Sequence, residues 1–153
     1  MSNPSGRLGA DTEAGLVLYL QGHGFPHAER RVTNGNKDRG DVTGCVGICW
    51  EAKGGNAAAL ASPGQIAEWM VETYVETKNA RADYGLLVTK RAGVGPARAG
   101  LWWAYLDSHA FLELSGAKPT TCPPSCTVRV TLAEAVALLR HAGYGDEPSA
   151  VSA

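Results

Sequence analysis

One stretch of the sequence decides how the chain is expected to fold: Arg39-Gly40-Asp41-Val42-Thr43-Gly44-Cys45-Val46-Gly47-Ile48-Cys49-Trp50-Glu51-Ala52-Lys53. Residues 40–43 and 47–53 flank a glycine-containing turn, and this pattern predicts a β-hairpin. Side chains alternate along a strand, so Glu51 and Lys53 are expected on one face. The opposite face carries the side chains expected in the core, which are Val46, Ile48, Trp50 and Ala52.

The position of Asp41 relative to Glu51 depends on the turn of this hairpin. A three-residue turn over residues 45–47, with Gly47 in the left-handed conformation, pairs Asp41 opposite Glu51. A slip of two residues keeps the two carboxylates diagonal neighbours, whereas a slip of one residue moves them to opposite faces. The sequence leaves this register open.

Two carboxylates placed side by side repel each other unless a cation lies between them. A divalent ion with oxygen ligands is the natural partner, and Mg²⁺ suits such a site. Lys53, on the same face, could hold a water molecule or neutralise a phosphate oxygen. The alternative interpretation is an exposed hairpin face with an ordinary ion pair, which contributes little to stability.

The other elements are predicted from hydrophobic periodicity and from helix and turn signals. They are a helix from Asp11 or Thr12 to residue 21, a strand over 25–32, a turn over 33–36, a helix to residue 80 after the loop at 62–64, a strand over 84–89, a strand over 101–106, a loop over 115–126, and a helix from the Thr131–Glu134 capping box to Gly143. This order predicts an α/β sandwich with a mixed central sheet flanked by helices.

Length and composition fit a single domain of ordinary size. The chain has 153 residues, 44% of them hydrophobic, and a net charge of −1, which excludes a globally basic nucleic-acid-binding coat. We expect one domain over residues 11–145, with a flexible arm over 1–10 and a flexible tail over 146–153. No apolar run is long enough for a transmembrane helix or a secretory signal, so a cytoplasmic location without membrane contact is expected.

The four cysteines are too few for a disulfide scaffold, and free thiols are expected in a reducing compartment. Their spacing leaves a zinc site as an alternative, because Cys45 and Cys49, like Cys122 and Cys126, are separated by three residues.

Asp41 followed by Glu51-x-Lys53 resembles the signature of the PD-(D/E)XK nuclease superfamily, with Gly40 where that signature has proline. Gln65-x-x-x-Trp69 resembles the helix motif of its RecB-type members, with tryptophan in place of tyrosine. Further stretches from His27 to Lys53, followed by Lys90-Arg91 and Trp102-Trp103, are similar to small Holliday junction resolvase-like proteins of phages that infect actinobacteria. The likeness covers roughly residues 10–143 and implies a restriction-endonuclease-like sandwich.

The resemblance implies a nuclease that cuts DNA with Mg²⁺, for which Mn²⁺ could substitute. Asp41, Glu51 and the backbone carbonyl of Ala52 would bind the metal, and Lys53 and Gln65 would complete the catalytic set. A further carboxylate from the first helix is implied near the metal, and Glu13 matches it by position. Glu29 is the competing candidate.

Basic residues gather in two short windows beside these motifs. We expect them to contact DNA phosphates, although solubility alone explains any single one. The candidates are Arg30, Arg31, Arg39, Lys90 and Arg91. Trp102 and Trp103 alternate in direction, so one is expected in the core, and the other could stack on a base or contact a partner subunit.

The function expected from these features is a magnesium-dependent, structure-specific DNA endonuclease that resolves four-way junctions by phosphodiester hydrolysis. A junction needs two symmetric cuts, which implies a homodimer, with the tryptophan-bearing strand the favoured contact. The alternatives are a RecB-like exonuclease or flap nuclease that acts as a monomer, and a catalytically silent DNA-binding module of the same fold.

Overall fold

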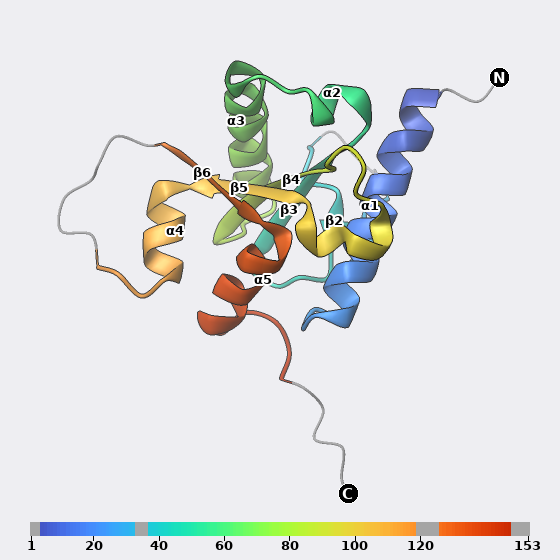
Figure 1. Cartoon of the computed structure of the whole chain (residues 1–153). Coiled ribbons are helices and arrows are strands. Elements are labelled where there is room, and N and C mark those ends of the chain that lie inside the picture. The colour runs from blue at the N-terminus through green and yellow to red at the C-terminus, as the bar shows by residue number, and fades with distance from the viewer. Residues whose placement is uncertain (1–3, 33–36, 119–125, 148–153) are drawn as a thin grey trace, which may run out of the picture.

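The computed structural model describes residues 4–32, 37–118 and 126–147. Its centre is a six-stranded sheet whose strands lie side by side in chain order (Figure 1). The strands are β1 (Glu29–Arg30), β2 (Val42–Thr43), β3 (Ile48–Lys53), β4 (Tyr84–Thr89), β5 (Trp103–Asp107) and β6 (Thr127–Thr131). Strands β3 and β4 are parallel and every other neighbouring pair is antiparallel, so the fold is α/β with a mixed sheet, as predicted.

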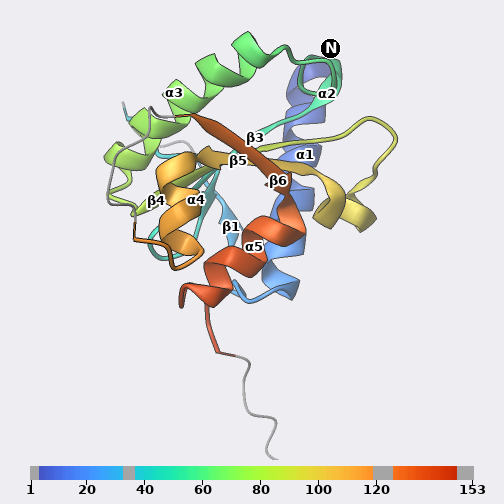
Figure 2. The ribbon, with the colours of Figure 1, turned by 60° about the vertical axis from the view of Figure 1, so that its left-hand side comes forward.

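Helices cover both faces of this sheet. They are α1 (Pro4–Gly22), α2 (Gly55–Ala59), α3 (Pro63–Asn79), the 3₁₀ helix η1 (Pro96–Leu101), α4 (Ser108–Leu114) and α5 (Leu132–His141). Figure 2 shows α3 and α5 on opposite sides of the sheet. The larger core joins α1, α4 and α5 to one face around Trp50 and Trp102, while α3 packs on the other face through Ile66 against Leu87 and Tyr105.

Local signals explain the bounds of the helices that frame the site. Ser62 caps α3 by accepting a hydrogen bond from the Gln65 amide at 3.1 Å, and Pro63 occupies the first turn. The predicted capping box of Thr131 and Glu134 begins α5. Gly85 of β4 leaves no space for a side chain against Thr77, and this close approach seats the C-terminal half of α3 on the sheet.

The N-terminal helix corrects one prediction. Helix α1 begins at Pro4, not at Asp11 or Thr12, so residues 4–10 are helical and not the expected arm, while residues 1–3 lie outside the described residues. Tertiary contact explains the extension, because Leu8 and Thr12 lie against the backbone at Gly54 and leave no space there for a side chain. The predicted start at Asp11 or Thr12 was therefore wrong, because the glycine content of residues 1–10 does not reveal this tertiary contact.

Other predictions also differ from the structure. The predicted strand over 40–43 is reduced to Val42–Thr43, and the one over 101–106 begins at Trp103 because residues 96–101 form the 3₁₀ helix. The strand over 25–32 is reduced to Glu29–Arg30, and Val46 lies 90% exposed at the hairpin tip, where no second layer covers it. Helix α4 and strand β6 were not predicted, because the short α4 depends on a cap from Asp107 rather than on a long periodic pattern. The turn at 33–36 and most of the loop over 115–126 lie outside the described residues, as does the tail beyond residue 147.

Within the described residues, no helix combines the length and the apolar character that crossing a membrane requires.

Candidate active site

The hairpin of β2 and β3 has the register that the three-residue turn predicts. Val42 pairs with Trp50, and Gly47 has a φ of 82°. The backbone pairing ends there, and Asp41, the next residue, bonds to the segment on both sides of Glu51. The Asp41 amide donates to the Trp50 carbonyl at 2.8 Å, and the Asp41 carboxylate accepts from the Ala52 amide at 2.8 Å. Asp41 is thereby fixed beside the Glu51–Lys53 segment.

The backbone also explains why glycine precedes Asp41. Gly40 has a φ of 87°, which the ring of proline cannot adopt. A side chain here would also lie 2.8 Å from both the Cys49 sulfur and the Trp50 carbonyl oxygen. Glycine in place of the proline of the superfamily signature is therefore required by this hairpin.

Glu51 is the most buried member of the predicted set. It is 5% exposed, and its Oε1 lies 2.8 Å from the Lys53 Nζ. Its Oε2 is buried and accepts no hydrogen bond from an N–H or hydroxyl donor among the described residues, although the carboxyl groups of Glu76 and Asp41 lie within hydrogen-bonding reach of the Glu51 side chain. Burial, together with the neighbouring Glu76 carboxyl, raises the pKa of Glu51 to about 7, although Lys53 acts in the opposite direction.

Asp41 responds to its surroundings in the same way. Burial first, and then the negative charge of Glu51, raise the pKa of Asp41 to about 7, while the hydrogen bond from Ala52 lowers it. Two carboxyl groups that are both costly to ionise therefore lie side by side. A cation between them would relieve this cost, because its charge replaces the lost solvation.

Glu76 of α3 joins this group, and the sequence analysis missed it. It is 6% exposed, interacts directly with Glu51, and has a buried Oε2 without a hydrogen-bond partner in the described part of the chain. Burial raises its pKa. The available signal was its position three residues after buried Thr73 and ten after buried Ile66, on the inward stripe of the helix.

Lys53 connects β3 to α3. Its Nζ lies 3.4 Å from Glu72 and 5.8 Å from the ring centre of Trp69. Burial lowers the pKa of Lys53, but the carboxylates of Glu51 and Glu72 outweigh it and the net pKa is raised. Lys53 is thus a firmly protonated cation, suited to neutralising negative charge rather than to accepting a proton.

The structure separates the two candidates for a further carboxylate. Glu13 of α1 pairs with Arg30 at 2.6 Å, and its charge contributes to the raised pKa of Asp41. Glu29 is exposed on β1, next to Arg30 in a strand where adjacent side chains point to opposite faces. Glu13 is therefore the carboxylate that the fold brings toward Asp41.

Gln65 does not join the group through any hydrogen bond seen in the described residues. The backbone amide of Gln65 donates a hydrogen bond to the Ser62 hydroxyl oxygen, which caps the helix. The side-chain amide of Gln65 donates to Glu68 on the same helix at 3.4 Å. Trp69, one turn later, is the member of that motif that reaches Lys53.

The basic candidates divide into those used within the fold and those that face outward. Arg30 is engaged by Glu13, and the amide of half-buried Arg31 donates to the Asp41 carbonyl at 2.8 Å. Arg39 is exposed. Lys90 follows β4 and its amide donates to the Lys53 carbonyl at 3.0 Å, which places Lys90 and Arg91 beside the Lys53 end of the sheet.

The metal prediction meets two observations. Across residues 4–32, 37–118 and 126–147, no three His, Cys, Asp or Glu side chains are arranged to hold a metal ion together. Mg²⁺, however, keeps several waters and binds through one or two carboxylates. Asp41 and Glu51, with the unpartnered buried Oε2 of Glu51, fit this mode of binding.

The cysteines do not suit zinc in this structure. Cys45, Cys49 and Cys126 are free, while Cys122 lies outside the described residues. Burial raises the pKa of Cys45 to about 11 and that of Cys49 to about 12, so neither readily forms the thiolate that binds zinc.

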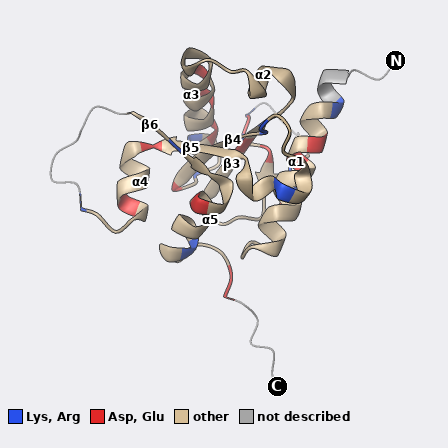
Figure 3. Cartoon of the chain, viewed as in Figure 1, with Lys and Arg blue, Asp and Glu red and all other residues tan. Residues whose placement is uncertain are grey.

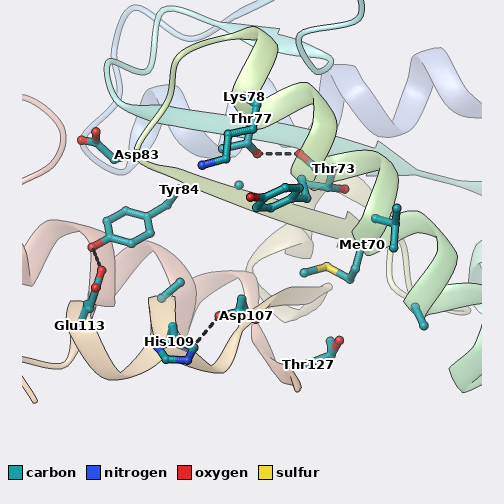
Figure 4. Close-up of a pocket in the computed structure, with 15 residues that line it drawn as sticks. Met70, Thr73, Thr77, Lys78, Asp83, Tyr84, Asp107, His109, Glu113 and Thr127 are labelled. Carbon is teal, nitrogen blue, oxygen red and sulfur yellow. Dashed lines mark hydrogen bonds between the residues drawn. The ribbon is translucent and has the colours of Figure 1, made fainter. Parts of the chain in front are cut away.

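A pocket of about 620 Å³ lies elsewhere, between α3, α4 and the sheet (Figure 4). Its lining includes three acidic residues, Asp83, Asp107 and Glu113, and does not include Asp41, Glu51 or Lys53. Tyr84 donates a hydrogen bond to Glu113 at 2.7 Å on its wall. The carboxylates make this pocket unsuited to phosphate, so it is distinct in place and in chemistry from the Asp41–Lys53 site.

Comparison of the chain with family models, with curated proteins and with solved structures finds no match, so the site is interpreted from its own geometry.

Proposed function

We propose that the chain is a magnesium-dependent, structure-specific DNA endonuclease of restriction-endonuclease-like fold, acting on four-way junctions. The observation that carries this proposal is the convergence of Asp41, Glu51 and Lys53 at one end of the hairpin, with a buried Glu51 oxygen that accepts no hydrogen bond from an N–H or hydroxyl donor in the described part of the chain. The order from α1 to β4, which is a helix, three strands, the short helix α2, the long helix α3 and a strand, supports the resemblance stated above.

Asp41, Glu51 and the Ala52 carbonyl would hold Mg²⁺ in this proposal. When bound, Mg²⁺ supplies Lewis-acid stabilisation of a phosphoryl oxygen and a bound water of lowered pKa. The chain itself supplies the negative charge that attracts the ion, held in place by the hydrogen bond between the Ala52 amide and Asp41.

Lys53 would neutralise the charge that develops on the scissile phosphate. Its position does not depend on Glu51 alone, because Glu72 and Trp69 hold it from α3. If Glu51 binds Mg²⁺ instead of pairing with Lys53, the contacts with Glu72 and Trp69 still keep the Lys53 ammonium group within the site. Glu72 is therefore a positioning residue for Lys53.

A homodimer remains part of the proposal, but we no longer place the contact between its subunits on the strand that carries Trp102 and Trp103. Trp102 is fully buried and Trp103 is half-buried, so the tryptophan strand offers little free apolar surface. The exposed apolar side chains of α3, Val71, Tyr74 and Val75, are between 51% and 65% exposed. We therefore place the dimer contact on α3.

The test is incubation of the purified chain with a four-way junction, a flap and a linear duplex, with Mg²⁺ and with a chelator. Symmetric cuts in the junction that require Mg²⁺ are expected, together with a dimer in sedimentation. A monomer that cuts flaps or ends would favour the exonuclease or flap-nuclease alternative, and binding without cleavage would favour a silent module.

A further inference from the structure

The side chain of Trp103 lies between two guanidinium groups. The Arg91 guanidinium carbon lies 4.1 Å from the ring centre of Trp103, and that of Arg129 lies 4.2 Å from it. Arg91 follows β4 and Arg129 belongs to β6, the two strands that flank Trp103 on β5. Cation–π contact of this kind holds both arginines in defined positions beside one flat ring.

Neither guanidinium group forms an ion pair with a carboxylate in the part of the chain that the structure describes. Within residues 4–32, 37–118 and 126–147, the ion pairs involve other side chains, and Arg91 donates only to the Leu101 carbonyl at 2.9 Å. Arg129 is exposed. Two ordered positive charges that lack a carboxylate partner among the described residues attract an external anion, because nothing nearby offsets their charge.

This cluster lies in line with the candidate active site. Across the sheet, Lys53 is next to Thr89, Thr89 is next to Trp103, and Trp103 is next to Thr131. Side chains of paired residues share a face, so Lys53 and Trp103 lie on the same face two strands apart. That separation is about 10 Å, or roughly three base steps along one DNA strand.

We propose that Arg91, Trp103 and Arg129 form a phosphate clamp for one strand of the DNA whose scissile phosphate lies at Lys53. The proposal rests on DNA being the substrate of the site described above. Each guanidinium group is planar and can donate two hydrogen bonds to one phosphate, and these hydrogen bonds would recognise the DNA backbone. Sequence analysis had included Arg91 but not Arg129, because a lone arginine in an unassigned segment gave no signal.

Charge elsewhere on the molecule agrees with this path. Acidic residues lie at both ends of α4, beyond the end of β5 that is farther from Trp103 (Figure 3). These are Asp107, which caps α4, and Glu113 near its end, and both line the pocket. A DNA strand is therefore repelled from that end and attracted to the clamp.

The experiment measures binding of a labelled four-way junction by anisotropy in a chelator, so that no cleavage occurs, over a series of salt concentrations. The double variant Arg91→Ala and Arg129→Ala should lower the slope of log K against log salt by about two units. Between about 50 and about 200 mM salt, this change reduces the loss of affinity by about tenfold. Arg91→Lys with Arg129→Lys should retain the slope.

Trp103 has a different expected signature, because it positions the arginines and carries no charge. Trp103→Leu should weaken binding with little change in slope, and Trp103→Phe should recover part of the affinity, since a flat ring returns. The matched control is Lys78→Ala with Lys118→Ala. It removes two exposed charges outside the cluster and should leave the slope unchanged. One of them, Lys78, lines the pocket and lies 5.1 Å from the ring centre of Tyr74 in a cation–π pair.

The outcomes separate this proposal from the proposed function. An unchanged slope in the Arg91–Arg129 double variant, with wild-type binding intact, overturns the clamp and leaves the nuclease proposal standing. A changed slope without any Mg²⁺-dependent cutting by the wild type supports the clamp and overturns the nuclease. No DNA binding by the wild type overturns both, and altered sedimentation with unchanged DNA binding would make the surface a subunit contact instead.

Discussion

Two groups of carboxyl side chains in this fold differ in their exposure to water and in their hydrogen bonds. Asp83 and Glu113 each accept a hydrogen bond from a tyrosine, from Tyr144 and Tyr84 respectively, both at 2.7 Å, and both carboxylates are exposed. Asp41, Glu51 and Glu76, here called the buried acid cluster, are largely removed from water. Glu51 and Glu76 each have an oxygen without a partner among the described residues.

The difference separates structure from function. The tyrosine-paired carboxylates are satisfied, and solvent screens their charge, so they hold loops and strands together at little cost. The buried acid cluster is unfavourable as it stands, because ionised groups in a buried site need compensation. Unfavourable arrangements of this kind concentrate at functional sites, and here a bound cation would relieve it.

The largest expected effect comes from neutralising the buried acid cluster. Asp41→Asn or Glu51→Gln removes a charge that would hold Mg²⁺, so junction cleavage should be abolished while junction binding survives. Cleavage is followed on a labelled junction with Mg²⁺, and binding is measured in a chelator. The matched control is Glu113→Gln, which keeps an acceptor for Tyr84 and should cut at the wild-type rate. Full cleavage by either variant would contradict the metal assignment.

Glu76 should give the next largest effect. Glu76→Gln preserves shape and hydrogen bonding but removes one of the charges beside Glu51, so the ion should be held less well. A loss of about 10- to 100-fold in cleavage rate is expected, the range typical of residues that support metal ligands. Raising the Mg²⁺ concentration should recover part of the rate. Glu68→Gln, an exposed neighbour on the same helix, is the control. Equal rates in the two variants would show that Glu76 is only structural.

The buried acid cluster also predicts how stability depends on pH. The pKa values of Asp41 and Glu51 are raised to about 7, above the value of about 4 in an unfolded chain. Between these values the folded chain binds more protons, so the free energy of unfolding falls as pH rises through this window. Lys53 opposes the shift of Glu51, and Glu76 reinforces it.

Thermal unfolding in a chelator should therefore show a lower Tm near pH 8 than near pH 5.5. Added Mg²⁺ should restore part of the Tm at the higher pH, because it compensates the ionised carboxylates. The double variant Asp41→Asn with Glu51→Gln should flatten the profile. A wild-type profile that rises over this range would contradict the raised pKa values.

The sequence predicted those parts of this picture that depend on local pattern. Strand β4 was predicted with its observed bounds because its apolar run is unbroken. The register of the hairpin was left open by the sequence, and the structure selects the three-residue turn with left-handed Gly47, in which Val42 pairs with Trp50. Glu76 was not recognised as a site residue, because periodicity alone does not fix how a helix is rotated against a sheet. That rotation depends on the close approach of Thr77 to Gly85, a contact between distant segments.

The smallest expected effect concerns the tyrosine-paired carboxylates. Tyr84→Phe removes the hydroxyl that donates to Glu113 but keeps the ring, which packs on the larger core and against Tyr144 with ring centres 5.8 Å apart. Because Glu113 is exposed, water can replace the lost donor, so the stability should fall by about 1 kcal/mol or less.

Cleavage should not change, because Tyr84 lies at the opposite end of β4 from Lys90 and touches no member of the buried acid cluster in the described residues. Urea unfolding and the junction assay measure the two quantities on one preparation. A loss of cleavage without a matching loss of stability would mean that the two groups of carboxyl side chains are coupled through β4, and the division between a structural and a functional group would no longer hold.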